Sequence, residues 1–209
     1  MTPSIIVVDD FYKQPNTVRS LAINAEYAPV YSLSPNFAGR ESAHSYYTES
    51  VVSALSGLVQ SRIEVDPQKN AFGRFRLAKQ GDARRTRVHF DNTKWSAVLY
   101  LTPPEHCAGG TVFFKHKATG LYGPPNDGEL NRLGYLSRQD FDSNVVAEDT
   151  LVCHRWDESV RVSMAYNRLV VFRGSELFHG SDFLFGHTSE DCRLTQVFFF
   201  NTLDQESPR

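Results

Sequence analysis

The chain has 209 residues, enough for one domain with a hydrophobic core, and its hydrophobic content of 41% and charged content of 22% are ordinary for a globular protein. The formal net charge of −2 provides no broad basic surface, so we expect neither a nucleic acid nor a membrane as a partner. The apolar run at residues 5–8 is too short for a signal peptide or a membrane span. Three separated cysteines without a CxxC pair are typical of free thiols in a reducing compartment, which predicts a cytoplasmic location.

Residues 1–66 are expected to form a short strand at 5–8 and two helices. Asn16 or Thr17 can cap a first helix that runs to about Glu26, and Thr48 can cap a second. The region between them, 28–46, has the composition of a loop. The expected buried residues are Val18, Leu21 and Ala22 in the first helix and Val51, Val52, Leu55, Leu58 and Val59 in the second.

After residue 66 the hydrophobic pattern changes to a period of two, which is typical of strands. Strands are expected at 72–77, 87–91, 96–102, 111–115, 168–173, 175–179 and 193–201. The polar segment 116–150 is predicted to be a long loop, either a lid, a binding loop or a mobile insertion. Two helices followed by about eight strands predict a single domain, 1–209, of mainly β structure with the helices packed outside a jelly roll or sandwich.

The most informative motif is His89-Phe90-Asp91, followed far downstream by His179 and then Arg193. Residues two apart on a strand point to the same side, so His89 and Asp91 can face one metal ion, and His179 can reach it from a distant strand. Two imidazoles and one carboxylate that leave other positions open suit non-haem Fe(II). Taken alone, the triplet is equally compatible with a core histidine beside a turn. The other histidines, His44, His106, His116, His154 and His187, have no partner at ligand spacing and are expected at the surface or in loops.

The surrounding segments extend this motif to most of residues 72–201. A Tyr-Leu strand (Tyr100-Leu101) follows it, then Gly109-Gly110-Thr111 before a hydrophobic strand, the distal His179, and Arg193 fourteen positions later. As an ordered set these motifs resemble those of the Fe(II)- and 2-oxoglutarate-dependent oxygenases, in particular their prolyl-4-hydroxylase-like branch. The resemblance implies a double-stranded β-helix core at 72–201, with 116–150 as an insertion.

The resemblance also implies roles for individual residues. His89, Asp91 and His179 match the iron ligands, and Arg193 matches the residue that binds the distal carboxylate of 2-oxoglutarate through its planar guanidinium. Thr195 and Tyr100 are candidates for additional hydrogen bonds to that carboxylate, with Ser96 a weaker one. Each of these three is alternatively an ordinary strand or core residue.

The implied reaction consumes 2-oxoglutarate and O2, releases succinate and CO2, and hydroxylates or otherwise oxidises a C–H bond of the substrate. The carboxylate of Asp91 takes the coordination position that halogenating relatives leave for chloride, which favours hydroxylation or desaturation over chlorination. Arg74 and Arg76 are expected on one strand face beside the site, as contacts to a substrate carboxylate or phosphate or as structural ion-pair partners. Asn92 and Trp95 are expected at the pocket entrance, the cluster 84–87 is expected to be a solvated turn, and 116–150 is the candidate shield of the site.

Several functions remain open at this point. The compact length favours a small metabolite or an amino-acid-like substrate over a peptide or protein, although a peptidyl hydroxylase is an alternative. A metal-binding jelly-roll sensor without turnover is another. Nucleic-acid dealkylating relatives carry a second arginine six positions after the first, where this chain has Phe199, and this disfavours that reading. The sequence does not indicate an oligomeric state.

Overall fold

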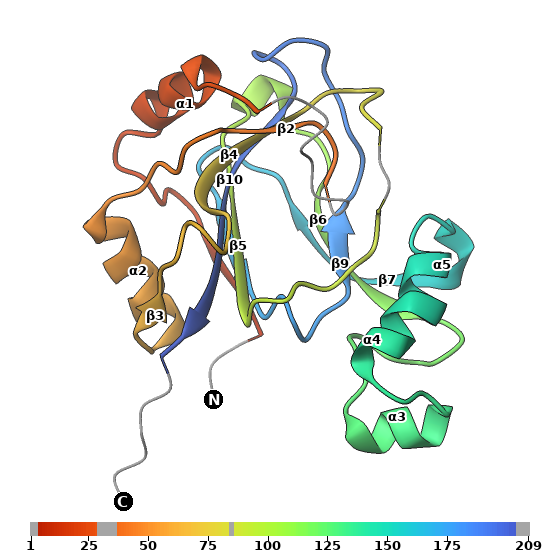
Figure 1. Ribbon diagram of the computed structural model, residues 1–209. Helices are drawn as coiled ribbons and strands as arrows, with labels where there is room; N and C mark the ends of the chain where they lie inside the picture. Colours follow the sequence, from red (N-terminus) through yellow and green to blue (C-terminus); the bar gives the residue numbers. More distant parts are fainter. Residues whose placement is uncertain (1–3, 29–36, 84–85, 204–209) are drawn as a thin grey trace, which may run out of the picture.

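The computed structural model describes residues 4–28, 37–83 and 86–203, in which two antiparallel sheets face each other (Figure 1). The larger sheet has the strand order β1-β8-β5-β10-β4-β2, with β3 paired to β10, and the smaller sheet has the order β7-β6-β9. The strands are β1 (Ile5–Val8), β2 (Arg40–Glu41), β3 (Ile63–Glu64), β4 (Phe72–Ala78), β5 (Trp95–Tyr100), β6 (Gly110–His116), β7 (Trp156–Ser163), β8 (Leu169–Phe172), β9 (His179–Ser181) and β10 (Arg193–Thr202). This mainly antiparallel, jelly-roll-like architecture with few helices confirms the predicted fold class.

The register of the larger sheet decides which side chains enter the space between the sheets. Thr195 of β10 lies opposite Tyr100 of β5 and Arg76 of β4, and Arg193 lies opposite Ala78. Directly paired residues of antiparallel strands project from the same face, and alternate residues project from opposite faces. The inner face of β4, β5 and β10 therefore carries Arg193, Thr195, Arg76 and Tyr100 toward the smaller sheet.

The outer face of the larger sheet carries the main hydrophobic core and is covered by α1 (Pro15–Asn24) and α2 (Glu49–Val59). The second helix is confirmed, with Thr48 at its N-cap position and Val51, Leu55 and Val59 buried. The first begins at Pro15, which suits a first helical turn because proline has no N–H to leave unpaired. The core residues of this face are Phe72, Phe75, Leu77, Trp95, Ala97, Leu99, Leu101, Leu169, Val171, Leu194, Phe198 and Phe200.

Three details of the first helix differ from expectation. Its N-cap residue is Gln14, so neither Asn16 nor Thr17 caps it. The helix ends at Asn24, before Glu26, because the next residue adopts an extended backbone conformation. Leu21 is 51% exposed, while Ala22 is fully buried and Val18 packs against the core. The face of this ten-residue helix that contacts the sheet is narrow, so it packs Val18 and Ala22 against the core but leaves Leu21 exposed.

The segment 116–150 is largely helical, and the predicted loop is therefore wrong. It forms α3 (Asp127–Leu133), α4 (Arg138–Phe141), a π-helical turn (Asp142–Val146) and α5 (Ala147–Asp149), which lie beside the smaller sheet (Figure 1). Their apolar residues pack with side chains on the outer face of that sheet; this second cluster includes Val112, Phe114, Leu130, Phe141, Val145, Val146, Trp156 and Phe178. The insertion thus buries one face of the smaller sheet.

Three strand assignments also need correction. Residues 87–91 form no continuous strand; His89 alone makes a β-bridge, to His179. Residues 175–178 form a turn, and β9 begins only at His179. The strand β7 was not predicted because most of its side chains are exposed, so the sequence shows no alternation of buried and exposed residues.

Within the described residues, no helix is long and apolar enough to cross a membrane.

Candidate metal centre and adjoining cavity

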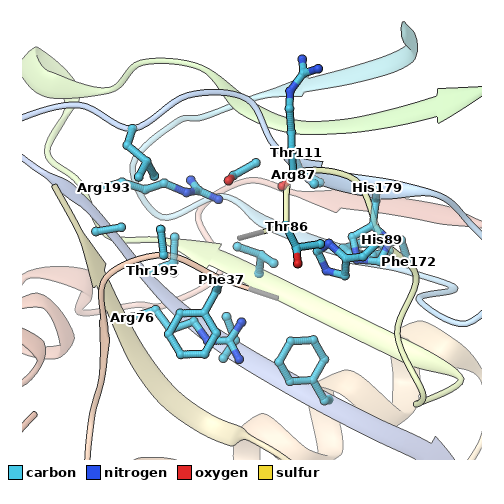
Figure 2. Close-up of a pocket in the computed structure, with 18 residues that line it drawn as sticks. Phe37, Arg76, Thr86, Arg87, His89, Thr111, Phe172, His179, Arg193 and Thr195 are labelled. Atoms are coloured by element: carbon cyan, nitrogen blue, oxygen red, sulfur yellow. The ribbon is translucent and has the colours of Figure 1, made fainter. Parts of the chain in front are cut away.

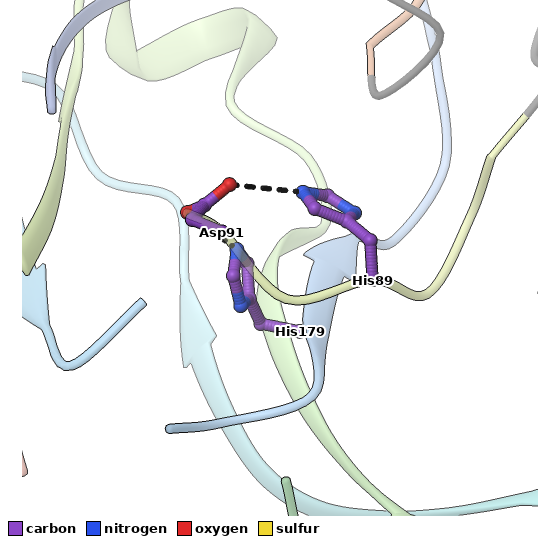
Figure 3. Close-up of side chains that lie close together, drawn as sticks. All are labelled: His89, Asp91 and His179. Atoms are coloured by element: carbon purple, nitrogen blue, oxygen red, sulfur yellow. Dashed lines mark ion pairs between the residues drawn. The ribbon is translucent and has the colours of Figure 1, made fainter. Parts of the chain in front are cut away.

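The three predicted ligands, His89, Asp91 and His179, come together between the two sheets (Figure 3). His89 and His179 exchange two backbone hydrogen bonds, of 3.0 and 2.8 Å, which fix the two segments side by side. The backbone N–H of Asp91 donates to the carbonyl of Gly174 at 2.9 Å and so holds the end of the motif against the turn after β8. An extended segment anchored at these points takes the place of the predicted strand.

The ligand atoms are close enough to share one ion. His179 Nε2 lies 3.1 Å from Asp91 Oδ2, His89 Nε2 lies 3.6 Å from Asp91 Oδ1, and one ligand atom from each of the three residues lies within 4.8 Å of the others. Ligand atoms that occupy one face of an ion at roughly 2.1 Å stand roughly 3 Å apart. The group therefore needs only small side-chain adjustments to hold a metal ion.

The protonation states suit metal binding. Burial lowers the pKa of His89 to about 3, and neighbouring His179 adds to the lowering, so the imidazole is neutral at neutral pH. Burial raises the pKa of the Asp91 carboxyl, but the two histidines and a hydrogen bond from Ser96 lower it by more, so the net pKa is below its ordinary value. Metal ligation requires a deprotonated carboxylate and neutral imidazoles.

Neighbouring groups orient the ligands. His179 Nδ1 lies 2.8 Å from the Leu177 carbonyl, which can only accept a hydrogen bond, so Nδ1 carries the hydrogen and the lone pair of Nε2 faces Asp91. The Ser96 hydroxyl donates to Asp91 Oδ2. Gly174 is required by close packing, because a Cβ there would lie 2.1 Å from Ser96 Oγ and 2.8 Å from Asp91 Oδ2.

A cavity of about 90 Å3 opens beside the two histidines (Figure 2). Its polar lining includes Thr111, Arg193, Thr195 and Arg76, and its apolar lining includes Phe37, Val98, Phe172, Val197 and Phe199. No aspartate or glutamate is among the described residues that line it. The space is therefore suited to an anionic molecule that contacts the metal centre at one end.

Arg193 lies in this cavity with an unpaired donor. Its Nη1 is buried and has no hydrogen-bond partner among the described residues, and its guanidinium carbon lies 5.5 Å from the ring centre of Tyr100. Burial lowers the pKa of Arg193, which reflects the cost of keeping this cation away from water. An anion beside Nη1 would remove that cost. Thr195 lies two residues away on the same strand face, as predicted.

Tyr100 is fully buried, and its hydroxyl shares a hydrogen bond of 2.7 Å with Thr111 Oγ1. This bond crosses from β5 of the larger sheet to β6 of the smaller sheet. Tyr100 therefore joins the two sheets next to Arg193, which agrees with the core role that the sequence left open for it.

The two arginines of β4 differ in their surroundings. Arg74 Nη1 donates to the carbonyls of Ser42 and Ala43 at 2.7 and 2.8 Å, which makes it a structural link to the segment after β2. Arg76 lines the cavity, and its Nε donates to Glu41 Oε2 at 2.8 Å. Only Arg76 of this predicted pair therefore reaches the cavity beside the metal centre.

Other predicted positions fall outside the cavity. Trp95 is 2% exposed and belongs to the core on the outer face of the larger sheet, so its placement at the pocket entrance is wrong. Asn92 lines an adjoining open groove together with Asp91 and Arg74, and Phe37, Arg76 and Phe199 line both this groove and the cavity. In the cluster 84–87, residues 84 and 85 lie outside the described residues, whereas Arg87 borders the cavity with its guanidinium over the ring of Phe114.

His116 is buried, contrary to the prediction of a surface or loop position. Its Nε2 lies 2.9 Å from Asp149 Oδ2 and its Nδ1 lies 3.0 Å from Thr119 Oγ1. These contacts fasten the end of the insertion to β6. The other four of these histidines are exposed, as expected.

Two cavity residues, Phe37 and Thr111, were not among the residues predicted for the site. Phe37 lies in a region that looks like a loop, and no periodic pattern indicates which way it points. Thr111 could have been found, because it precedes Phe113 by two residues in a strand whose alternate residues face the larger sheet.

Fold and geometry together define a jelly-roll-like protein with a buried His-Asp-His group that could hold a metal ion. The chain belongs to a family of unknown function, DUF6445, whose model matches residues 2–200. No curated protein matches it.

Two solved structures are similar to the chain at low identity. A Pseudomonas putida prolyl-4-hydroxylase is 16% identical with a TM-score of 0.45, over 97% of this chain and 95% of that chain. An N-substituted L-amino acid dioxygenase from Burkholderia ambifaria AMMD is 10% identical with a TM-score of 0.39, over 96% of this chain and 86% of that chain.

Proposed function

We propose that this protein is an Fe(II)- and 2-oxoglutarate-dependent oxygenase that oxidises a C–H bond of a small metabolite or an amino-acid-like substrate. One observation carries the proposal. His89 and His179 of the ligand group line the same cavity as Arg193, whose Nη1 has no hydrogen-bond partner among the described residues, so one cavity combines two metal ligands with a buried cation.

The ligand set fits Fe(II). Two neutral nitrogen donors and one carboxylate leave positions open on an ion that prefers six ligands, and thiolates, which would favour zinc, are absent from the group. The hydrogen bond from His179 Nδ1 to the Leu177 carbonyl and the one from Ser96 to Asp91 hold two of the three ligands in place. Such contacts to ligands support metal affinity.

The cavity fits 2-oxoglutarate as the co-substrate. Arg193 offers a planar guanidinium to a terminal carboxylate, and Thr195 offers a hydroxyl from the same strand face. The volume of about 90 Å3 admits several water-sized groups, which suits a five-carbon diacid better than a larger cofactor. Tyr100 and Thr111, bonded to each other, hold the wall beside Arg193.

Iron with 2-oxoglutarate supplies the oxidising chemistry, with O2 consumed and succinate and CO2 released. The protein's own residues position the co-substrate and keep water out of the site. Arg193 fixes one end of the co-substrate, so its other end meets the metal in one orientation. Val98, Phe172 and Val197 exclude water from the space between the two ends.

A peptidyl or protein hydroxylase is the second candidate, and one feature favours it. An open groove of about 510 Å3 adjoins the cavity, and its lining includes Asp91, Arg74 and Asn92. The cavity beside the two histidines is narrow, and a narrow space favours a small molecule over a peptide chain as the substrate. A metal-binding sensor that binds no anion would leave the Nη1 donor of Arg193 without a partner.

Succinate production tests the proposal. Purified protein loaded anaerobically with Fe(II) is exposed to O2 and 2-oxoglutarate, first alone and then with pools of amino acids, N-acyl amino acids and short peptides. Succinate formation that requires both Fe(II) and O2, and rises with one pool, supports the oxygenase and names its substrate class. Metal binding without loss of 2-oxoglutarate under any condition supports the sensor and rejects the enzyme.

A further inference from the structure

Arg76 lines the cavity, and the proposed function leaves it without a role. Its guanidinium carbon lies 3.9 Å from the ring centre of Phe37 and 5.0 Å from that of Phe199, and Figure 2 shows it beside Phe37, on the same side of the cavity as Thr195. It lines the same cavity as the metal ligands His89 and His179 and as Arg193.

The contacts of Arg76 fix its orientation but leave most of its donors unused. Glu41 accepts from Nε at 2.8 Å, and no hydrogen bond to either Nη exists within the described residues. The Arg76 side chain is 18% exposed, so it is largely removed from water. A guanidinium held by two rings and one carboxylate presents its Nη edge at little entropic cost, and that edge matches a carboxylate.

Arg76 and the charged side chains around it carry a net positive charge of one. Glu41 is the only carboxylate in reach of Arg74 and Arg76 among the described residues, at 3.8 and 2.8 Å respectively. Two cations and one carboxylate leave one positive charge in the groove that Arg74, Arg76 and Glu41 line beside the cavity. A monoanion balances it, whereas a phosphate monoester carries a charge of about −1.5 to −2 at neutral pH and overcompensates.

We infer that the Nη edge of Arg76 binds a carboxylate of the substrate, and that the substrate body next to this carboxylate is apolar. The apolar part follows from Phe37 and Phe199, which lie against Arg76 and line the adjoining open groove with it, so the substrate body has room outside the co-substrate cavity. Arg76 thus selects monocarboxylates with a hydrocarbon portion, while Arg193 holds the co-substrate. The inference rests on the proposed function, because it assigns the substrate position of the same site.

The test uses hexanoate as the probe, with hexanamide of equal size as its uncharged partner. The protein is loaded with Mn(II), which replaces Fe(II) without turnover, and saturated with 2-oxoglutarate. Broadening of the probe's proton NMR lines by Mn(II) reports binding close to the metal. We expect hexanoate to be broadened and hexanamide to be unaffected. We expect Arg76→Leu to weaken hexanoate binding by about tenfold or more, since a charge-assisted bidentate pair is lost.

Two further variants separate binding from folding. Arg76→Lys keeps the charge that pairs with Glu41 but removes the flat two-donor edge, so hexanoate binding should still weaken. Arg173→Leu is the matched control: Arg173 also lies over an aromatic ring, that of Trp95 at 5.0 Å, and pairs with Glu176, but it does not line the cavity. It should leave hexanoate binding unchanged.

Calorimetric titration of 2-oxoglutarate into the same Mn(II)-loaded proteins separates this inference from the proposed function. A wild-type protein that binds no 2-oxoglutarate rejects the proposed function itself. If 2-oxoglutarate binds but hexanoate and hexanamide behave alike, the carboxylate site is rejected and the oxygenase stands. Equal losses of 2-oxoglutarate and hexanoate in Arg76→Leu assign Arg76 to the co-substrate instead. Tighter binding of hexyl phosphate than of hexanoate also overturns the inference.

Discussion

The two faces of the larger sheet differ in chemistry although they share the same strands. The outer face of β4, β5 and β10 carries Phe72, Leu99 and Phe198 against the N-terminal helices, whereas the inner face carries Arg76 and Arg193 around the cavity. Every second residue of these strands therefore buries apolar surface in the core, and the residues between them line the cavity. Residues that stabilise the fold and residues that line the cavity thus alternate along each strand.

This separation predicts that substitutions on the two faces have different consequences. Changes on the outer face should lower the free energy of unfolding and leave ligand affinities of the folded protein unchanged. Changes on the inner face should lower metal, co-substrate or substrate binding at a smaller cost in stability.

The largest effect is expected from the metal centre. His179→Ala removes one of three ligand side chains, and metal affinity falls steeply when a neutral imidazole donor is lost. Succinate formation should fall to background, and Mn(II) should no longer bind at micromolar concentration. Calorimetry with Mn(II) and a succinate assay measure these outcomes. Wild-type turnover in the variant would reject the ligand assignment.

The outer face should respond in stability instead. Phe198 is fully buried and lies 5.2 Å from Phe72 between ring centres, so Phe198→Ala should cost about 3–5 kcal/mol of unfolding free energy in a denaturant titration. Phe199→Ala is the matched variant, because the neighbouring ring is only half-buried and lines the cavity. It should cost clearly less stability and weaken hexanoate binding. Equal stability losses in the two variants would contradict the division between the faces.

Co-substrate affinity should fall by an intermediate amount when the inner face loses its buried cation. Arg193→Ala removes the unpaired Nη1 donor, and the dissociation constant of 2-oxoglutarate should rise by about 10- to 100-fold, which corresponds to charged hydrogen bonds of about 1.5–3 kcal/mol. Arg193→Lys should recover only part of the loss, because an ammonium cannot form two parallel bonds. Calorimetry in the presence of Mn(II) measures both. Unchanged affinity in the alanine variant would remove 2-oxoglutarate from this end of the cavity.

The sequence predicted those parts of the site that depend on residue type and strand alternation. The three ligands and Arg193 could be found from residue type and their order along the chain, although 87–91 is not a continuous strand. Thr195 could be found because alternate residues of β10 lie on the same face. The same rule would have excluded Trp95: Ser96 and Tyr100 face inward, so Trp95 must face outward. Closeness to the motif in the sequence is therefore a weaker guide to the cavity lining than alternation along the strand.

The remaining parts depend on contacts between distant segments. The setting of Arg76 requires Phe37, Glu41 and Phe199 from three separate strands or loops, and no local pattern joins them. The insertion was predicted to be a loop because its helices are short and polar on most sides. Asn126 and Glu129 form a capping box, and Gly134 ends α3 with a φ of 80°. These signals were present in the sequence and would have indicated a helix.

A carboxylate outside both faces gives the smallest expected effect. Asp191, in the loop before β10, accepts backbone hydrogen bonds from Thr188 and His187 and one from the Thr188 hydroxyl. These bonds lower its pKa from 3.8 to about 2. A group whose pKa is lowered by folding stabilises the native state above its unfolded pKa, and this contribution disappears as the pH falls through the folded pKa.

Asp191→Asn should therefore lower the melting temperature slightly at neutral pH, and its difference from the wild type should shrink as the pH falls from about 5 to about 2. Melting curves of both proteins across this range measure the difference. Mn(II) and 2-oxoglutarate affinities at neutral pH should match the wild type, because the carboxylate lies outside the cavity. A constant difference at every pH would show that the loop depends on the shape of the side chain and that its charge contributes nothing.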